Sequence, residues 1–305
     1  MSSSPEAVIR LGLIGAGRWG KNFIRTIRGL DGVTLSALCS RHPDSRSLVD
    51  SPCTILRDWH DLVGNDLCDG VIIATPPDIH AEILGAMIRA RIPSMVEKPL
   101  TLDLQEALDL QQLLRQNPTP VLVDHTYLFH PAYRELKRLS SQLGPIRSIQ
   151  SEGGGPGPFR PNYTALWDYG PHDISMCLDL MNQTPHSVTC RACERNQGGN
   201  YECDLFFPDN VRASIKVGNL ASAKVRILTV RHDEHSLTFD DLSPQKLWLD
   251  STPITVAEKL PLQTAVEALV SGIRSGTTEP LDLAVEVIRT LHVAQQSLRG
   301  QQTGC

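Results

Sequence analysis

The chain has 305 residues, of which 41% are hydrophobic and 21% charged, and this is the balance of an ordinary globular protein with two domains. Its formal net charge of −5 and the lack of a Lys/Arg-rich run argue against a surface that coats nucleic acid. No apolar stretch reaches the length that spans a bilayer, and the start, MSSSPEAVIR, has no cationic segment followed by an apolar one. We therefore expect a cytoplasmic protein that binds neither nucleic acid nor membrane.

Eight cysteines are spread along the chain, at positions 39, 53, 68, 177, 190, 193, 203 and 305. In a cytoplasmic protein we expect them to be reduced, with Cys39 and Cys203 packed in apolar strands as small hydrophobic residues. Cys190 and Cys193 have the spacing of half a zinc site, but no second pair follows, and a strand turns these two positions to opposite faces. We therefore predict no metal.

The first 125 residues alternate between apolar runs and amphipathic stretches. The apolar runs predict strands at 8–15, 34–39, 70–75, 94–98 and 120–125, and the amphipathic stretches predict helices at 18–30, 78–92 and 102–116. Short buried strands joined by helices of this length form right-handed βαβ units and a parallel sheet. We predict an α/β protein whose residues 1–124 form a doubly wound, dinucleotide-binding Rossmann domain.

The remainder, 125–305, changes character. Helical patterns at 132–144 and 166–181 flank a Gly/Pro-rich stretch at 153–162, and turn signals then separate a series of short alternating segments. Such segments favour antiparallel hairpins, and two helices close the chain. This predicts an α+β substrate-binding and oligomerisation domain with a large, mostly antiparallel, open-faced sheet. Burying such a face commonly produces dimers or tetramers, so we expect a homo-oligomer.

Gly15-Ala16-Gly17-Arg18-Trp19-Gly20 is a G-x-G-x-x-G sequence between the first predicted strand and the first predicted helix. In that setting Gly15 permits the tight turn, Gly17 lets a pyrophosphate approach the backbone, and Gly20 lets the helix pack closely on the strand. The helix N-terminus supplies free N–H groups and a positive dipole end for the phosphates. The alternative is a glycine-rich turn of another α/β protein. The βαβ setting favours a dinucleotide.

The end of the second predicted strand carries Ser40 and Arg41 where an NAD enzyme has a carboxylate for the ribose 2′-hydroxyl. A guanidinium and a hydroxyl suit a 2′-phosphate instead. We predict that NADP(H) is preferred and that NAD(H) is possible. The alternative is that Arg41 is a solvated loop residue.

Further motifs follow predicted strands at the edge where a doubly wound sheet binds its ligand. Ala74-Thr75-Pro76 ends one strand, Glu97-Lys98-Pro99 ends the next, and Asp168 and His172 begin a helix of the second domain. Together with the glycine loop, these motifs resemble those of the glucose-fructose oxidoreductase and inositol dehydrogenase family (Gfo/Idh/MocA) over essentially the whole chain. A weaker likeness, in WDYGPHDIS and the later KVRILTV segment, is to a branch that acts on nucleotide-linked sugars.

The resemblance implies that Lys98, Asp168 and His172 line a substrate beside a nicotinamide, and that the bond before Pro99 is cis. Oxidation of a secondary alcohol removes a proton from oxygen, and an imidazole that titrates near neutral pH suits this transfer. We therefore expect His172 to be the general base, Lys98 to donate to the substrate oxygen, and Asp168 to orient a hydroxyl or the imidazole. The alternatives are a structural histidine, an N-capping Asp168 and a surface Lys98.

The full set of cofactor-binding candidates is Gly15, Ala16, Gly17, Arg18, Trp19, Gly20, Ser40, Arg41, Ala74, Thr75, Pro76, His80, Glu97 and Lys98. The substrate-binding candidates are Lys98, Tyr127, Arg160, Asn162, Asp168 and His172. Tyr127 follows the last strand of the first domain, and Arg160 and Asn162 lie in the Gly/Pro-rich stretch. The segment His232-Asp233-Glu234-His235 lies between two predicted strands, so we predict a hairpin turn there.

The chain departs from many members of the family near the histidine. Ser175 stands where they have a further aspartate, and Asp173 instead follows His172 directly. The substrate of no relative is therefore carried over. We predict an NAD(P)-dependent oxidoreductase that acts on a secondary alcohol or ketone of a sugar, polyol or nucleotide-linked sugar. The alternatives are a non-catalytic NAD(P)-binding regulatory protein and a reductase of a non-sugar substrate such as a linear tetrapyrrole.

Overall fold

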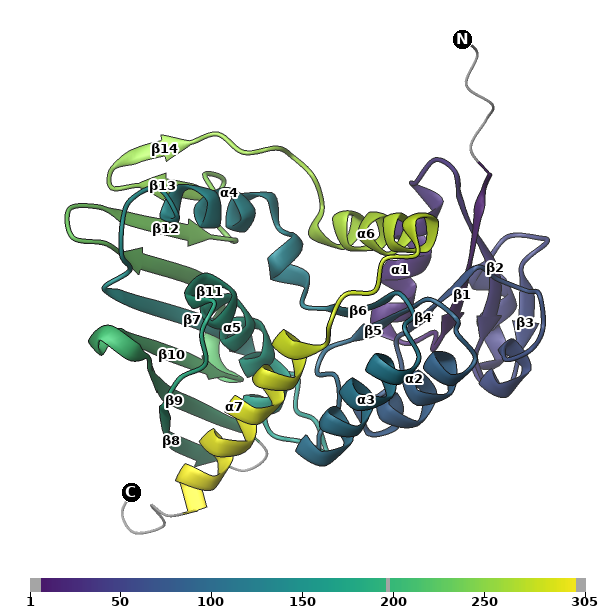
Figure 1. The fold of residues 1–305 in the computed structure, drawn as a ribbon, viewed down its shortest axis with the longest axis horizontal. Coiled ribbons are helices and arrows are strands. Elements are labelled where there is room, and N and C mark those ends of the chain that lie inside the picture. Colours follow the sequence, from purple (N-terminus) through teal and green to yellow (C-terminus); the bar gives the residue numbers. More distant parts are fainter. Residues whose placement is uncertain (1–6, 196–197, 300–305) are drawn as a thin grey trace. The chain divides into compact units, whose positions relative to one another are not determined.

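The computed structural model describes residues 7–195 and 198–299 (Figure 1). The chain forms two compact units, the first made of residues 1–124 and 262–285 and the second of residues 125–261 and 286–305. The sequence predicts a division between residues 124 and 125 with all later residues in the second domain. In the structure, the segment 262–285 lies with the first unit instead. Each unit is described by itself below.

The first unit contains a six-stranded parallel sheet with the strand order β3-β2-β1-β4-β5-β6. Its strands are β1 (Ile9–Ile14), β2 (Val33–Cys39), β3 (Thr54–Leu56), β4 (Gly70–Ile73), β5 (Ser94–Glu97) and β6 (Val121–Asp124). The chain runs outward from β1 to β3 and then returns to β4 on the other side of β1. The order therefore reverses between β1 and β4, which is where a doubly wound sheet binds its ligand.

The apolar sequence of its strands explains why this sheet is buried on both faces. All four residues of β4 are buried, and Val71, Ile72 and Ile73 are inaccessible to solvent, as in a strand covered on both faces. The helices of this unit are α1 (Arg18–Arg28), α2 (His80–Arg89), α3 (Leu104–Gln116) and most of α6 (Pro261–Ser275). The predicted parallel Rossmann fold is confirmed. Strand β3 has only three residues, too few to form an apolar run like those that predicted the other strands.

The second unit contains an eight-stranded sheet with the order β14-β13-β12-β11-β7-β10-β9-β8. Its strands are β7 (Ser148–Pro156), β8 (Ser187–Arg195), β9 (Gly198–Phe206), β10 (Arg212–Gly218), β11 (Leu220–Arg231), β12 (Ser236–Asp240), β13 (Leu247–Leu249) and β14 (Thr252–Ile254). Among the described strands of this eight-stranded sheet, only β7 and β10 pair in parallel. The predicted, mostly antiparallel sheet is confirmed.

Helices α4 (Pro131–Ser140) and α5 (Ala165–Met181) contact this sheet, and the part of α7 (Asp282–Arg299) after residue 285 also belongs to this unit (Figure 1). Alternation separates the two faces of the sheet. Ile149 and Ser151 of β7 are buried on the face that α5 covers, whereas Glu202 and Lys216 of β9 and β10 are exposed on the other. In the part of the chain that the structure describes, no helix is long and apolar enough to cross a membrane.

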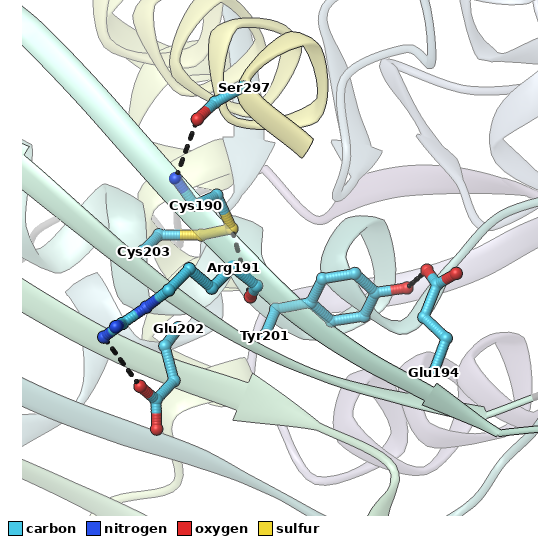
Figure 2. The surroundings of a disulfide bond; sticks show 7 residues. All are labelled: Cys190, Arg191, Glu194, Tyr201, Glu202, Cys203 and Ser297. Atoms are coloured by element: carbon cyan, nitrogen blue, oxygen red, sulfur yellow. Dashed lines mark hydrogen bonds and ion pairs between the residues drawn. A yellow bond between two sulfur atoms is a disulfide. The ribbon is translucent and has the colours of Figure 1, made fainter. Parts of the chain in front are cut away.

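The expectation that all cysteines are reduced is wrong for one pair. Cys190 of β8 and Cys203 of β9 are joined by a disulfide, which Figure 2 shows bridging the two strands beside Ser297 of α7. The two residues are directly opposite each other, with their Cα atoms 4.1 Å apart. The prediction of reduced cysteines rested on the cellular compartment alone, and it did not consider that strand pairing could place two cysteines opposite each other. Cys193 is exposed on the opposite face, as the strand pattern predicted, and the described residues hold no metal-binding group of three or more His, Cys, Asp or Glu.

Candidate active site

The turn between β1 and α1 requires its glycines. Gly15 has a φ of +102°, and a Cβ there would lie 2.6 Å from the carbonyl oxygen of Ala74. A Cβ on Gly20 would lie 2.0 Å from the carbonyl oxygen of Gly15, so only glycine allows this approach of α1 to β1. Around Gly17, in contrast, no atom lies within 4 Å of where a Cβ would be.

Gly17 is the N-cap of α1 and is exposed, so the backbone at the start of this helix is open to a ligand. The first turn of α1 has no acidic residue, Arg18 is exposed, and Trp19 is half-buried. The free N–H groups and the positive dipole end of a helix bind anionic groups, and an open glycine lets a pyrophosphate approach them. These residues fit the phosphates of a dinucleotide.

Ser40 and Arg41 follow β2 at the same edge of the sheet. The backbone N–H of Ser40 donates to Leu56 of β3, and its hydroxyl accepts from the backbone N–H of His42. Arg41 is exposed and has no hydrogen bond or ion pair to another described residue. The guanidinium of Arg41 is thus accessible to an anionic ligand beyond the end of β2.

A buried histidine, His80, supports the loop after β4. His80, the first residue of α2, is fully buried, and its Nε2 and Nδ1 atoms lie 2.9 Å from the carbonyl oxygens of Thr75 and Pro99. Burial lowers the pKa of His80, which favours the neutral ring. Ala74 and Thr75 are half-buried and Pro76 is exposed. His80 therefore connects the loops after β4 and β5 from within the core, while Pro76 faces solvent.

The ends of β5 and β6 bring two carboxyl groups together. Glu97 is paired in register with Asp124, and both are buried. Burial raises the pKa of Glu97 well above its ordinary value, and the negative charge of Asp124 adds to the rise. The next residue, Lys98, is half-buried, and the bond between Lys98 and Pro99 is cis. The cis bond that the resemblance implied is present.

In the second unit, helix α5 presents Asp168 and His172 on one side. The two residues are four apart, which is about one helical turn, and are 8% and 9% exposed. Asp168 accepts a hydrogen bond of 3.0 Å from Nε of Arg160 and forms an ion pair with it. Asn162, which we also predicted at the site, is exposed. Arg160, from the Gly/Pro-rich stretch, thus binds the first turn of α5 through Asp168.

Tyr127 contacts the other predicted residue of α5. It lies in the turn Thr126–Phe129 after β6, and its ring meets that of His172 edge to face with centroids 5.1 Å apart and planes at 89°. Three residues later, His130 has a structural role instead, because its Nδ1 caps α4 and its Nε2 lies 3.2 Å from Asp241. Tyr127 is therefore the residue of this turn that contacts the proposed base.

The sequence did not lead us to a buried ion pair beside His172. Asp173 accepts hydrogen bonds from Arg226 of β11 and from the hydroxyl of Ser151 of β7. Arg226 alternates with Leu228 and Val230, which are buried. A charged residue at the inward position of an apolar strand is the signal that could have found it.

The predicted hairpin at 232–235 is confirmed. Strands β11 and β12 are antiparallel neighbours, and the N–H of His232 donates to the carbonyl oxygen of His235. His232 hydrogen-bonds with Gly144 and Ser140, and His235 with Asp250. The ring nitrogens of these histidines therefore have structural partners.

Each unit thus assembles part of the predicted site. In the first unit, the glycine turn, Ser40, Arg41 and the loops after β4 and β5 lie at the carboxyl edge of the parallel sheet. In the second, Tyr127 and His172 are in contact, as are Arg160 and Asp168.

Comparison with known proteins shows that the chain is similar to known oxidoreductases. A family model described as an oxidoreductase family with an NAD-binding Rossmann fold matches residues 9–125. Inositol 2-dehydrogenase of Rhizobium meliloti is 24% identical over 193 residues. That match covers 60% of this chain and 58% of the Rhizobium protein, so it spans less than two thirds of that protein's length.

Two solved structures resemble nearly the whole chain. A protein from Magnetospirillum magnetotacticum MS-1, described as a proposed oxidoreductase, is 39% identical with a TM-score of 0.88, and the match covers 95% of this chain and 100% of that one. UDP-N-acetylglucosamine 3-dehydrogenase from Acidithiobacillus ferrooxidans has a TM-score of 0.85 over 96% of this chain and 98% of that one. At 18% identity, the second likeness shows a shared fold.

Proposed function

The chain belongs to the Gfo/Idh/MocA oxidoreductase family, and from this we propose that it is an NAD(P)-dependent dehydrogenase or reductase. Its proposed substrate is a secondary alcohol, or the matching ketone, of a sugar, a polyol or a nucleotide-linked sugar. The inositol dehydrogenase of Rhizobium meliloti and the nucleotide-sugar dehydrogenase of Acidithiobacillus ferrooxidans support this class of substrate.

The glycine turn supports a dinucleotide as the cofactor, because Gly17 leaves open the space that a pyrophosphate needs. Residues 15–20 would hold the phosphates at the start of α1. Arg41 and Ser40 would hold a 2′-phosphate, which favours NADP(H) over NAD(H). Ala74, Thr75, Pro76 and Glu97 would line the rest of the cofactor. His80 would act from below by bracing these loops, since it is fully buried.

When bound, the nicotinamide ring would accept or supply the hydride at the substrate carbon. His172 would take the proton from the substrate hydroxyl in oxidation and return it in reduction. Lys98 would donate a hydrogen bond to the same oxygen and stabilise the negative charge that develops there. Asp168, already paired with Arg160, would accept a hydrogen bond from a neighbouring hydroxyl. Tyr127 and Asn162 would contact the rest of the substrate.

We also propose a cytoplasmic homo-oligomer, a dimer or a tetramer, that binds a small molecule and needs neither metal nor nucleic acid. The support is that α4 and α5 pack on one face of the eight-stranded sheet, while β9 and β10 expose Glu202 and Lys216 on the other. A second copy on the open face would bury it.

The observation that carries the proposal is the pair Asp168 and His172, which are both buried on one side of α5. The carboxylate of Asp168 is also held in place by its ion pair with Arg160. The test is to incubate the protein with NADP⁺ or NAD⁺ and a panel that includes inositols, other polyols, sugars and UDP-N-acetylglucosamine. Reduced nicotinamide is followed by absorbance. We expect turnover with at least one compound, and faster turnover with NADP⁺.

His172→Gln and Lys98→Met are then compared with the wild type. We expect each to lower kcat by ~10²- to 10⁴-fold, the usual contribution of a general acid or base or of an oxyanion donor. In His172→Gln, cofactor affinity should stay within ~3-fold. Turnover that survives both substitutions would contradict the assigned roles. No turnover with any compound, despite tight cofactor binding, would favour a regulatory protein.

A further inference from the structure

Asp173 and Arg226 form an ion pair in the interior of the second unit. Their side chains are 0% and 6% exposed, and Nη1 of Arg226 lies 2.5 Å from Oδ2 of Asp173. Moving two charges out of water costs several kcal/mol for each, and well-packed apolar residues of the same volume are often as stable or more so. Stability alone therefore does not explain why this ion pair is present. Its position beside His172 suggests that it has another role.

The pair is held on several sides. The other carboxylate oxygen of Asp173 accepts a hydrogen bond of 2.6 Å from the hydroxyl of Ser151 on β7. The guanidinium of Arg226 lies against the backbone of Gly153, where a Cβ would come within 2.3 Å of Nη1 and 2.5 Å of Cζ. Gly153 and Arg226 are paired in register on β7 and β11. Any side chain at position 153 would displace the guanidinium, so the site of Arg226 is closely defined.

The guanidinium of Arg226 in turn packs against the ring of Tyr127. Cζ of Arg226 lies 4.6 Å from the ring centroid, a cation–π contact between a buried guanidinium and a half-buried ring. Burial raises the pKa of Tyr127, so its phenol stays neutral. The same ring meets the imidazole of His172 at 5.1 Å, edge to face. Contacts thus run from Asp173 through Arg226 and Tyr127 to His172, which is the residue next to Asp173 on α5.

We propose that Asp173, Arg226 and Tyr127 are positioning residues that hold the imidazole of His172 in one orientation. This inference rests on the proposed role of His172 as the proton-transferring group. An imidazole on a helix has several rotamers, and proton transfer needs one of them held within a fraction of an ångström. The buried ion pair supplies a rigid support for the tyrosine ring, and the ring limits the rotation of the imidazole. Neither Asp173 nor Arg226 needs to contact the substrate.

The first test needs no substrate and so does not depend on turnover. Protein labelled with ¹⁵N at its histidines is examined by NMR, and the imidazole signals of His172 are identified as those missing from His172→Gln. The double variant Arg226→Met/Asp173→Asn removes both charges and leaves no lone buried ion. We expect the His172 signals to shift and to show averaging between tautomers, since Tyr127 loses its support. Unchanged His172 signals in the folded variant would overturn the proposal.

Two tyrosine variants separate the ring from its hydroxyl. We expect Tyr127→Phe to keep the His172 signals close to those of the wild type, and Tyr127→Leu to change them as the double variant does. Tyr201→Leu removes a buried tyrosine of β9 in the same unit, whose hydroxyl bonds Glu194 instead, and is the matched control. Should Tyr127→Phe and Tyr127→Leu change the signals equally, a hydroxyl contact would replace our explanation.

The second test measures kinetics with whichever compound the substrate panel identifies. In Arg226→Met/Asp173→Asn we expect kcat to fall by ~10- to 100-fold, the scale of a misplaced catalytic group, with KM within ~3-fold. The control Arg147→Met/Asp233→Asn removes an exposed ion pair of the same unit and should leave both constants unchanged. A raised KM with unchanged kcat would instead indicate a role in substrate binding and would refute positioning.

Discussion

Glu97 and Lys98 are neighbours in sequence, yet their surroundings differ. Glu97 is buried beside Asp124 at the ends of two parallel strands, whereas Lys98 is half-buried. A carboxyl group in such a place is easier to bury with its proton than without it, so the pKa of Glu97 lies well above its ordinary value. The folded protein therefore binds a proton at Glu97 at pH values where the unfolded chain has lost it.

The sign of the resulting pH dependence follows from linkage. A raised pKa in the folded state contributes stability that is complete below the pKa of the unfolded chain, about 4.3, and is lost as pH rises through the folded value. Glu97→Gln cannot ionise, so we expect its melting temperature to exceed that of the wild type increasingly from pH 5 to pH 8, by ~2 to 5 °C at the upper end. Thermal melts of both proteins in matched buffers measure this difference.

The control for this prediction is Glu106→Gln, which removes an exposed carboxylate of α3 in the same unit. The difference in melting temperature between Glu106→Gln and the wild type should stay constant over the same pH range. A Glu97→Gln difference that stays constant, or that shrinks as pH rises, would show that Glu97 is ionised in the folded protein.

At the scale of elements, β8 and β9 form the edge of the eight-stranded sheet and carry the disulfide. Cys190 also donates its backbone N–H to the hydroxyl of Ser297 on α7, so the bond lies where the edge of the sheet meets this helix (Figure 2). On the other face, Arg191 pairs with Glu202 across the same strands, but both are exposed, and such pairs add little. The covalent link is therefore the stronger restraint on this edge.

Closing a loop of this length stabilises a fold by about 3 kcal/mol in the chain-entropy description. The two cysteines are 13 residues apart. We expect reduction, or the double variant Cys190→Ala/Cys203→Ala, to lower the melting temperature by ~5 °C, and we expect a reductant to have no further effect on that variant. Differential scanning calorimetry with and without reductant measures both effects.

Cys193→Ala is the matched control, because Cys193 is a free, exposed cysteine on the same strand. It should keep the response to reductant that the wild type shows. A wild-type protein that melts at one temperature in either redox condition, with its thiols confirmed as reduced by labelling, would contradict the contribution of this bond.

At the scale of the whole molecule, the open face of the eight-stranded sheet is the surface that a second copy would cover. Ile227 of β11 points to this face, since its neighbours Arg226 and Leu228 are buried on the other one. It is half-buried and lies between Glu152 and Asp240 of the adjacent strands. An apolar residue at the centre of a polar face is suited to the core of an interface.

We expect Ile227→Asp to dissociate the oligomer, since it would place a third acidic group next to Glu152 and Asp240 at the centre of the buried face. Light scattering coupled to size-exclusion chromatography gives the mass of each protein. Gln112→Asp, which adds the same charge to the exposed side of α3, should leave the mass unchanged. A wild-type protein with the mass of one chain would refute the oligomer outright.

Local patterns were enough to predict the Rossmann fold and the glycine turn. The strands of the first unit are short apolar runs. The requirement for glycine at Gly20 comes from Gly15, five residues away, and the requirement at Gly15 comes from Ala74, directly after the adjacent strand β4. The same holds for the pair Asp168 and His172, because one helical turn places them on one side. Their catalytic roles and the preference for NADP(H) remain predictions.

Other features depend on residues far apart in the chain, and only the tertiary structure decided them. Arg226 meets Asp173 across 53 positions, and Cys190 meets Cys203 because of the register of two strands. Residues 262–285 join the first unit after more than a hundred residues of the second. Local propensity and periodicity act over one or two turns of chain, whereas these contacts follow from how strands pair and pack, which a single sequence does not reveal.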